Sequence, residues 1–229
     1  MNTHYMKASI FSALVSASLT VNAGVVISPS IINGPSAAAG NVNGLINQSG
    51  LSSTYISGIT DFNSYLATNP THIDVASNIS RGYASVTPFP VNLDLDFGLS
   101  YTITDAVLWN WNWATTAGTD QFEVFSSIDA TFSTLTSLGT FNMNEVASNN
   151  TAANHQLFDL TDISTQYLRV ALQSNHGFSG GSSGVGLVEM AFGAEAPTTS
   201  APTPSAIALL GLGIAGLQIS RKRQAITGK

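Results

Sequence analysis

Apolar and polar residues alternate strictly along residues 91–97, with Asn92, Asp94 and Asp96 at the polar positions and Gly98 directly after the run. A period of two indicates a strand that buries one face and turns these polar side chains toward water or a metal. Later stretches rich in β-branched and aromatic residues are separated by clusters of Gly, Asn, Ser and Asp, which favour turns. Further strands are therefore predicted over residues 101–113, 121–126, 138–142, 155–160, 166–174 and 185–192.

Many short strands at regular spacing predict an all-β domain of the sandwich or jelly-roll type. No long segment between residues 24 and 196 has the 3.6-residue period of an amphipathic helix. The early part, residues 25–83, is richer in Asn, Ser and Gly, so we expect one or two strands and long loops there.

Charge is scarce and unevenly placed. Only 9% of the 229 residues are charged, against roughly 25% in an ordinary soluble domain. All 13 acidic residues lie between Asp61 and Glu195, where Arg81 and Arg169 are the basic ones, so this part has a formal charge of 2 − 13 = −11. Such a surface repels polyanions, so no nucleic-acid partner is expected, and divalent cations or neutral sugars suit it better. Cysteine is absent, which excludes disulfides, thiol catalysis and Cys-ligated zinc.

Residues 1–23 have the pattern of a secretory signal peptide. Lys7 supplies the positive start, an apolar and small-residue run covers residues 8–19, and Val21 and Ala23 are the small residues that a signal peptidase accepts. Cleavage is predicted between Ala23 and Gly24.

The other end has three successive parts. Residues 194–204 are a linker of Pro, Thr, Ser and Ala, residues 205–220 are mostly apolar, and Arg221, Lys222 and Arg223 follow at once. An apolar run before a basic cluster predicts a C-terminal transmembrane helix with its positive end in the cytoplasm. The run is shorter than the roughly 20 residues that span a bilayer, so a transient insertion is expected.

This order resembles the PEP-CTERM sorting signal of Gram-negative bacteria over residues 202–229. The motif is Pro202-Thr203-Pro204, in which Thr203 replaces the Glu of the family. The resemblance implies an exosortase-type processing enzyme as a partner. It also implies export through the inner membrane, a transient membrane anchor in residues 205–229, and delivery to the cell surface or extracellular matrix.

The domain between the ends, residues 24–193, resembles discoidin-type (F5/8 type C) domains. The residues that carry the resemblance are 92–98, 101–104, 122–129 with Phe132, 167–170 and 186–193. It implies a galactose-binding-like jelly-roll β-sandwich. Many such modules hold a structural Ca²⁺, and the positions that match its ligands are Asn47 and Ser52 in an early loop and Glu189 near the end. Asn47 stands where the family has Asp, which lowers the ligand charge.

Trp109, Trp111 and Trp113 alternate with Asn110 and Asn112. In a strand the three indoles share one face. We expect Trp109 in the core, and we expect Trp111 and Trp113 to line a glycan-binding face, because indole rings stack on the apolar C–H surface of sugars.

A Gly/Ser-rich loop begins at residue 174. Within it Asn175, His176 and Phe178 are candidates for contacting a hydroxylated ligand, and a solvent loop without a ligand is the alternative. Residues 177–181 match G-x-S-x-G, but more Gly and Ser follow where a nucleophile elbow needs a helix.

No catalytic set of residues is indicated. The sequence predicts an exported, non-catalytic cell-surface or extracellular-matrix protein whose β-sandwich binds carbohydrate, such as exopolysaccharide or another envelope glycan. The alternative is a structural matrix or envelope protein with no specific small ligand.

Overall fold

The computed structural model describes residues 24–37, 39–73, 81–85, 88–177 and 184–196. The predicted signal peptide, Phe178 and the sorting segment with Pro202, Thr203, Pro204, Arg221, Lys222 and Arg223 lie outside these residues. Within the described part, no helix is long and apolar enough to cross a membrane.

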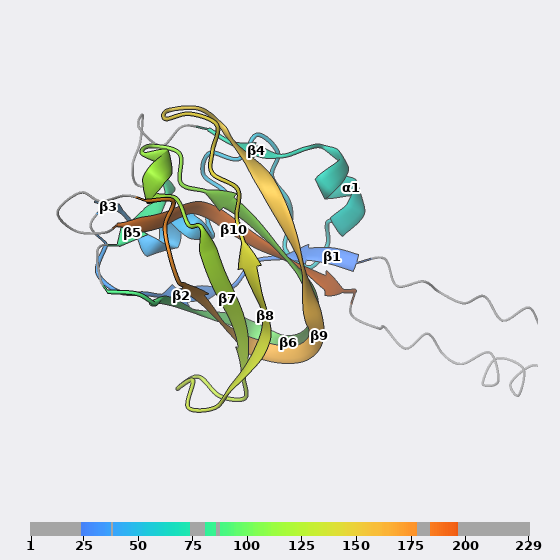
Figure 1. Cartoon of the computed structure of the whole chain (residues 1–229). Helices are drawn as coiled ribbons and strands as arrows, with labels where there is room; N and C mark the ends of the chain where they lie inside the picture. The colour runs from blue at the N-terminus through green and yellow to red at the C-terminus, as the bar shows by residue number, and fades with distance from the viewer. Residues whose placement is uncertain (1–23, 38, 74–80, 86–87, 178–183, 197–229) are drawn as a thin grey trace, which may run out of the picture.

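Two long strands organise the fold. β6 (Val91–Asn110) and β9 (Ala153–Leu172) each have 20 residues and pair antiparallel from Val91↔Leu172 to Trp109↔His155. Both strands bend at one corner, which Figure 1 shows as a curve in the ribbon. There the register runs from Asp96↔Tyr167 directly to Tyr101↔Thr165, so residues 97–100 of β6 lie opposite Gln166 alone. Such a bulge bends the chain without ending the pairing.

The bend divides the sheet into two layers. The first layer consists of five neighbouring segments in this order: β8 (Leu135–Asn142), β7 (Gln121–Ser127), the second half of β9, the first half of β6, and β2 (Ile31–Asn33). In the second, β10 (Val185–Glu195) and β4 (Thr71–His72) flank the other halves of β6 and β9. β1 (Gly24–Ile27) and β5 (Tyr83–Ser85) pair with β10, and β3 (Ala39–Gly40) pairs with β5. All these pairs are antiparallel, and their arrangement confirms the predicted mostly-β sandwich.

The main core lies between the layers. The predicted apolar face of residues 91–97 is fully buried there, together with residues of β7, β9 and β10. A second apolar cluster covers the outer side of the second layer. It contains Val107 and Trp109 from β6, with Tyr55 and with Phe62 and Tyr65 of helix α1 (Phe62–Ala67). Short 3-10 turns occur at Val42–Leu45 and Thr115–Ala117.

The strand predictions need four corrections. The strands expected at 155–160 and 166–174 form one strand, β9. Those expected at 91–97 and 101–113 likewise join as β6. In both cases the strand continues because the corner bulge does not interrupt the pairing of β6 with β9. β6 ends at Asn110, so Trp111 and Trp113 are not in a strand. The early part contains β1 to β5 and α1 rather than one or two strands. β10 runs to Glu195, beyond the expected domain end at 193, because Gly24 and Val25 of β1 pair with its last residues.

Candidate functional site

The end of β6 is held by the buried side chain of Asn110. Its Oδ1 accepts hydrogen bonds from the N–H of Trp111 (2.9 Å) and of Thr119 (2.8 Å). Its Nδ2 donates to the carbonyls of Thr119 (2.8 Å) and Asn144 (3.0 Å). One amide therefore joins three chain segments, and the main chain leaves the sheet at this point.

The three tryptophans have different environments. Trp109 is fully buried and donates from Nε1 to the carbonyl of Pro70 at 3.0 Å, which confirms its predicted core position. Trp111 is 2% exposed and lies against Gly82 and Gly186, where added Cβ atoms would be 2.9 and 3.1 Å from its ring. The prediction that Trp111 lines a glycan-binding face is therefore wrong, because no ring face is open. Trp113 is 45% exposed, as predicted.

Trp113 projects from a firmly held base. Its ring centroid lies 6.3 Å from that of Trp111, with 59° between the ring planes. On its N-terminal side, Asn112 is buried. Its Nδ2 donates to the carbonyl of Thr151 (2.9 Å), and its main-chain carbonyl accepts from the N–H of Asn150 (2.7 Å). An exposed indole on a rigid base loses little conformational freedom when a ligand stacks on it.

Polar side chains from another loop bind the chain just after this tryptophan. Two residues after Trp113, the N–H of Thr115 donates to Oδ1 of Asn149 at 2.7 Å, and its Oγ1 donates to Oε1 of Glu145 at 2.7 Å. Asn149 and Glu145 are exposed. The sequence reasoning missed both, since they lie 34 and 30 positions from Thr115 along the chain. In the sequence, only the turn-forming residues Ser148, Asn149 and Asn150 indicate a loop here.

Glu145 also borders a hollow of about 270 Å³ under the same loop. Asn154 and His155 of β9 line its other side. The wall is braced by Gln156, which accepts from the N–H of Asn144 (2.7 Å) and donates to the carbonyl of Asn144 (3.0 Å). Hydroxylated ligands are bound by exposed aromatic faces, carboxylates and amides. These groups are supplied here by Trp113, Asn149, Glu145 and this hollow. We refer to them as the Trp113 surface.

Asn175 and His176 lie at the same end of the sandwich. His176 is largely buried, with Nδ1 at 3.6 Å from Oδ1 of Asp120 and Nε2 at 3.4 Å from Nδ2 of Asn110. Asn175 donates to the carbonyl of Gly184 (2.8 Å) and accepts from the N–H of Gly177 (3.0 Å). Both side chains thus bond to other parts of the described chain, and their contact with a ligand stays a prediction.

Glu189 follows a bulge in β10 and points into the second apolar cluster. It is fully buried, and neither carboxylate oxygen has a hydrogen-bond partner of acceptable geometry among the described residues. Burial raises the pKa of this carboxyl well above its usual range, and the nearby main chain of Gln48 and Met190 offsets only part of that shift. Burial, followed by the charge of Glu189, also raises the pKa of Tyr55 and Tyr65.

The structure does not bring the predicted metal ligands together. Asn47 and Ser52 are exposed, whereas Glu189 is buried. Oδ1 of Asn47 accepts from the N–H of Ser49 (2.8 Å), and Oγ of Ser52 accepts from the N–H of Thr71 (2.9 Å). No group of three or more His, Cys, Asp or Glu side chains in the described residues has the spacing to hold a metal. Gln48, the neighbour of Asn47, is the loop residue whose main chain reaches Glu189.

The chain matches no protein-family model and no curated protein in sequence. In shape it is similar to a truncated AlyQ with a family 32 carbohydrate-binding module and an alginate lyase domain (TM-score 0.48, 11% identity, 75% of this chain and 34% of that one). It is also similar to the family 32 module of NanJ from C. perfringens in complex with galactose (TM-score 0.46, 10% identity, 74% and 98%). A third similar structure is a putative chitobiase fragment from Bacteroides thetaiotaomicron (TM-score 0.45, 16% identity, 74% and 93%).

The chain spans about a third of the length of the first of these structures. At identities of 10–16% and TM-scores below 0.5, the similarities establish neither a family nor a ligand for this chain.

Proposed function

We propose that this protein is a non-catalytic carbohydrate-binding module that uses the Trp113 surface. The observation that carries the proposal is an indole 45% exposed on a rigid base, two residues before Thr115, which is hydrogen-bonded to the exposed side chains of Glu145 and Asn149. The ring offers a flat apolar surface to the C–H face of a sugar, and the flanking amide and carboxylate pair with its hydroxyls. Exopolysaccharide or another neutral envelope glycan is the proposed ligand class.

Binding rather than hydrolysis is the better assignment for this surface. Glycoside hydrolysis commonly needs two carboxyl groups across the scissile bond. Glu145 is the one carboxylate among the residues that line the hollow of about 270 Å³.

The test compares Trp113→Ala with Ile59→Ala, which removes another exposed apolar side chain, 72% exposed, away from this surface. Affinity electrophoresis through gels that contain neutral exopolysaccharide measures the dissociation constant. We expect Trp113→Ala to weaken binding at least about tenfold and Ile59→Ala to leave it unchanged. Equal binding by both variants contradicts the proposal, and self-association without sugar competition favours a purely structural matrix protein.

We also propose that Glu189 contributes to a structural Ca²⁺ site. A buried carboxylate whose oxygens have no well-formed hydrogen bond within the described residues suits a bound cation, and Ca²⁺ accepts neutral main-chain and side-chain oxygens beside a single carboxylate. Further oxygens would come from the main chain of the loop at residues 47–52, because the side chains of Asn47 and Ser52 are exposed and already accept hydrogen bonds. The ion would neutralise Glu189 and tie the loop at residues 47–52 to β10. Thermal unfolding with added Ca²⁺ and with chelator tests this, and identical midpoints argue against the site.

The two ends of the chain are proposed to direct its export and sorting. A leader cleaved before Gly24, followed by processing near Pro202-Thr203-Pro204 by an exosortase-type enzyme, would release the domain to the cell surface or matrix. N-terminal sequencing and intact mass of the surface-exposed protein test both steps. A mature chain that retains residues 1–23 or 205–229 contradicts the corresponding step.

A further inference from the structure

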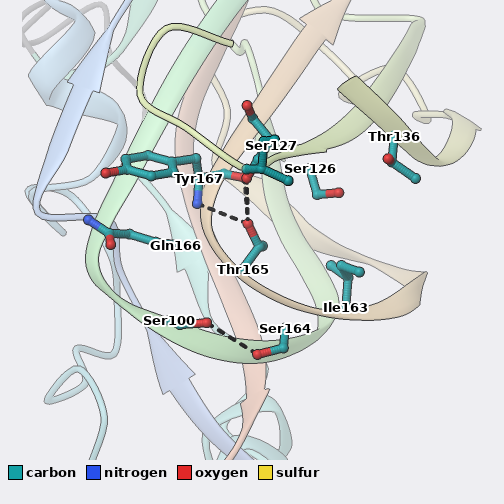
Figure 2. Close-up of a pocket in the computed structure, with 10 residues that line it drawn as sticks. Ser100, Ser126, Ser127, Thr136, Ile163, Ser164, Thr165, Gln166 and Tyr167 are labelled. Atoms are coloured by element: carbon teal, nitrogen blue, oxygen red, sulfur yellow. Dashed lines mark hydrogen bonds between the residues drawn. The ribbon is translucent and has the colours of Figure 1, made fainter. Parts of the chain in front are cut away.

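A second hollow lies at the other end of the sandwich, at the corner where β6 and β9 bend. It has a volume of about 380 Å³ and is formed by the end of β7, the start of β8 and the bends of β6 and β9 (Figure 2). The register of β6 and β9 places Trp109 opposite His155 at one end and Tyr101 opposite Thr165 at the corner. The corner hollow is therefore separate from the Trp113 surface, which follows the far end of β6.

The hollow is built on internally bonded residues. Thr165 is buried, and its Oγ1 lies 3.0 Å from the carbonyl of Ser127 and accepts from the N–H of Tyr167 at 3.1 Å. On the opposite wall, the hydroxyls of Ser100 and Ser164 are 3.2 Å apart. Figure 2 shows these bonds on two sides of the space. The walls are thus ordered before any ligand arrives, which lowers the entropy cost of binding.

The lining is rich in hydroxyl groups and carries no charged side chain. The hydroxyl-bearing lining residues are Ser100, Ser126, Ser127, Thr136, Ser164, Thr165 and Tyr167. The remaining ones are Gln166, whose Nε2 donates to Asp96 at 2.9 Å, and the apolar Ile128 and Ile163.

This chemistry selects one ligand class. A phosphate or carboxylate ligand finds no countercharge on these walls, and a cation finds no carboxylate. Hydroxyl side chains both donate and accept hydrogen bonds, as sugar hydroxyls do. Ile128, which is 83% exposed, supplies an apolar surface for the C–H face of a ring.

The hollow continues beyond the pair of Ser100 and Ser164. Both serines also line a neighbouring space of about 280 Å³, which is bordered by Leu99, Tyr101, Thr102, Ala196 and one acidic residue, Glu195. Small-molecule sites commonly begin near 300 Å³, so the two spaces together accommodate more than one sugar ring.

We propose that this corner hollow is a second binding site for neutral carbohydrate, separate from the Trp113 surface. It takes an uncharged oligosaccharide whose hydroxyls pair with the Ser and Thr side chains. With glycan held at both ends, one domain bridges two polysaccharide strands. The corner site itself does not depend on the Trp113 surface.

The test is a ¹H–¹⁵N NMR titration of the full chain with a mixture of neutral gluco-, galacto- and manno-oligosaccharides, up to about 10 mM so that millimolar affinities are detected. We expect amide shifts at Ser126, Ser127 and residues 164–167. Thr136→Trp, which fills the hollow, should abolish these shifts, whereas Thr140→Trp on the same strand outside the hollow should keep them. Ser164→Leu provides a second variant at an exposed position if Thr136→Trp perturbs the spectrum broadly.

The outcomes separate the two sites. Corner shifts that persist in Trp113→Ala and vanish in Thr136→Trp or Ser164→Leu support the second site, whatever happens at Trp113. Shifts confined to the neighbourhood of Trp113, or no shift with any neutral sugar, overturn it. Corner shifts that survive both filling variants overturn it as well, because the ligand then lies elsewhere.

Discussion

Arg169 of β9 donates two hydrogen bonds to the carboxylate of Asp94 on the neighbouring strand β6. Its Nε lies 2.6 Å from Oδ1, and Nη2 lies 2.8 Å from Oδ2. The guanidinium also lies 4.9 Å from the ring centroid of Phe132, in the loop after β7. This pair joins the two central strands of the first layer to the loop that borders the corner hollow.

Breaking this pair should destabilise the domain. With side chains only 19% and 25% exposed, the two-fold hydrogen bond is partly shielded from water. We expect Asp94→Asn to lower the free energy of unfolding by about 2 kcal/mol, and Arg169→Lys to lower it similarly because an ammonium cannot make the fork. Urea denaturation measures both. Asp162→Asn, at an exposed position, is the control that should change little.

Removing the amide of Asn110 should cost more. Asn110→Ala deletes bonds to Trp111, Thr119 and Asn144 and takes away the partner of the buried N–H of Trp111. We expect a loss of about 3 kcal/mol or more in the free energy of unfolding. Tryptophan fluorescence should report a more mobile Trp113. An unchanged urea midpoint would show that water replaces these bonds at no cost.

Glu189 predicts an unusual pH dependence. Its folded pKa lies above the ordinary value of 4.5, so the folded state holds a proton that the unfolded state has lost. In chelator, this residue therefore destabilises the domain increasingly as pH rises from about 4.5 through the folded pKa. Glu189→Gln should have a higher melting temperature than the wild type at pH 7 in chelator and a flatter pH profile. Added Ca²⁺ should stabilise only the wild type.

If Glu189→Gln melts lower than the wild type in chelator, the carboxylate has partners that stabilise its charged form, and the interpretation of Glu189 as an uncompensated buried acid is wrong.

The turn between β7 and β8 gives a fourth prediction. The pKa of the Asp129 carboxyl is lowered to about 2, because the carboxylate accepts hydrogen bonds from the hydroxyls of Thr131 and Ser133 and from the N–H of Thr131. NMR titration of its side-chain carboxyl should place the midpoint near that value. The contribution of Asp129 to stability is present above its unfolded pKa of about 3.8 and is lost as pH falls toward 2. In Thr131→Val the midpoint should move up, and an unmoved midpoint would remove the hydroxyl as the cause.

Local pattern was sufficient for the strand class and for part of the core. The alternation over 91–97 predicted which side chains of β6 are buried, because a period of two follows from strand geometry alone. Likewise, the apolar residues before Trp109 indicated its burial, and the departure of the chain into Ala114 and Thr115 indicated the exposure of Trp113.

Contacts between distant segments decided the rest. Trp111 is buried because Asn110 ends the strand and because Gly82 and Gly186, far away in the sequence, leave room for the indole. Glu145 and Asn149 join Trp113 only through hydrogen bonds to Thr115. The corner hollow lies at the bend where four residues of β6 lie opposite one residue of β9. Strand register and loop packing depend on pairing across the chain, and the order of neighbouring residues carries no record of that pairing.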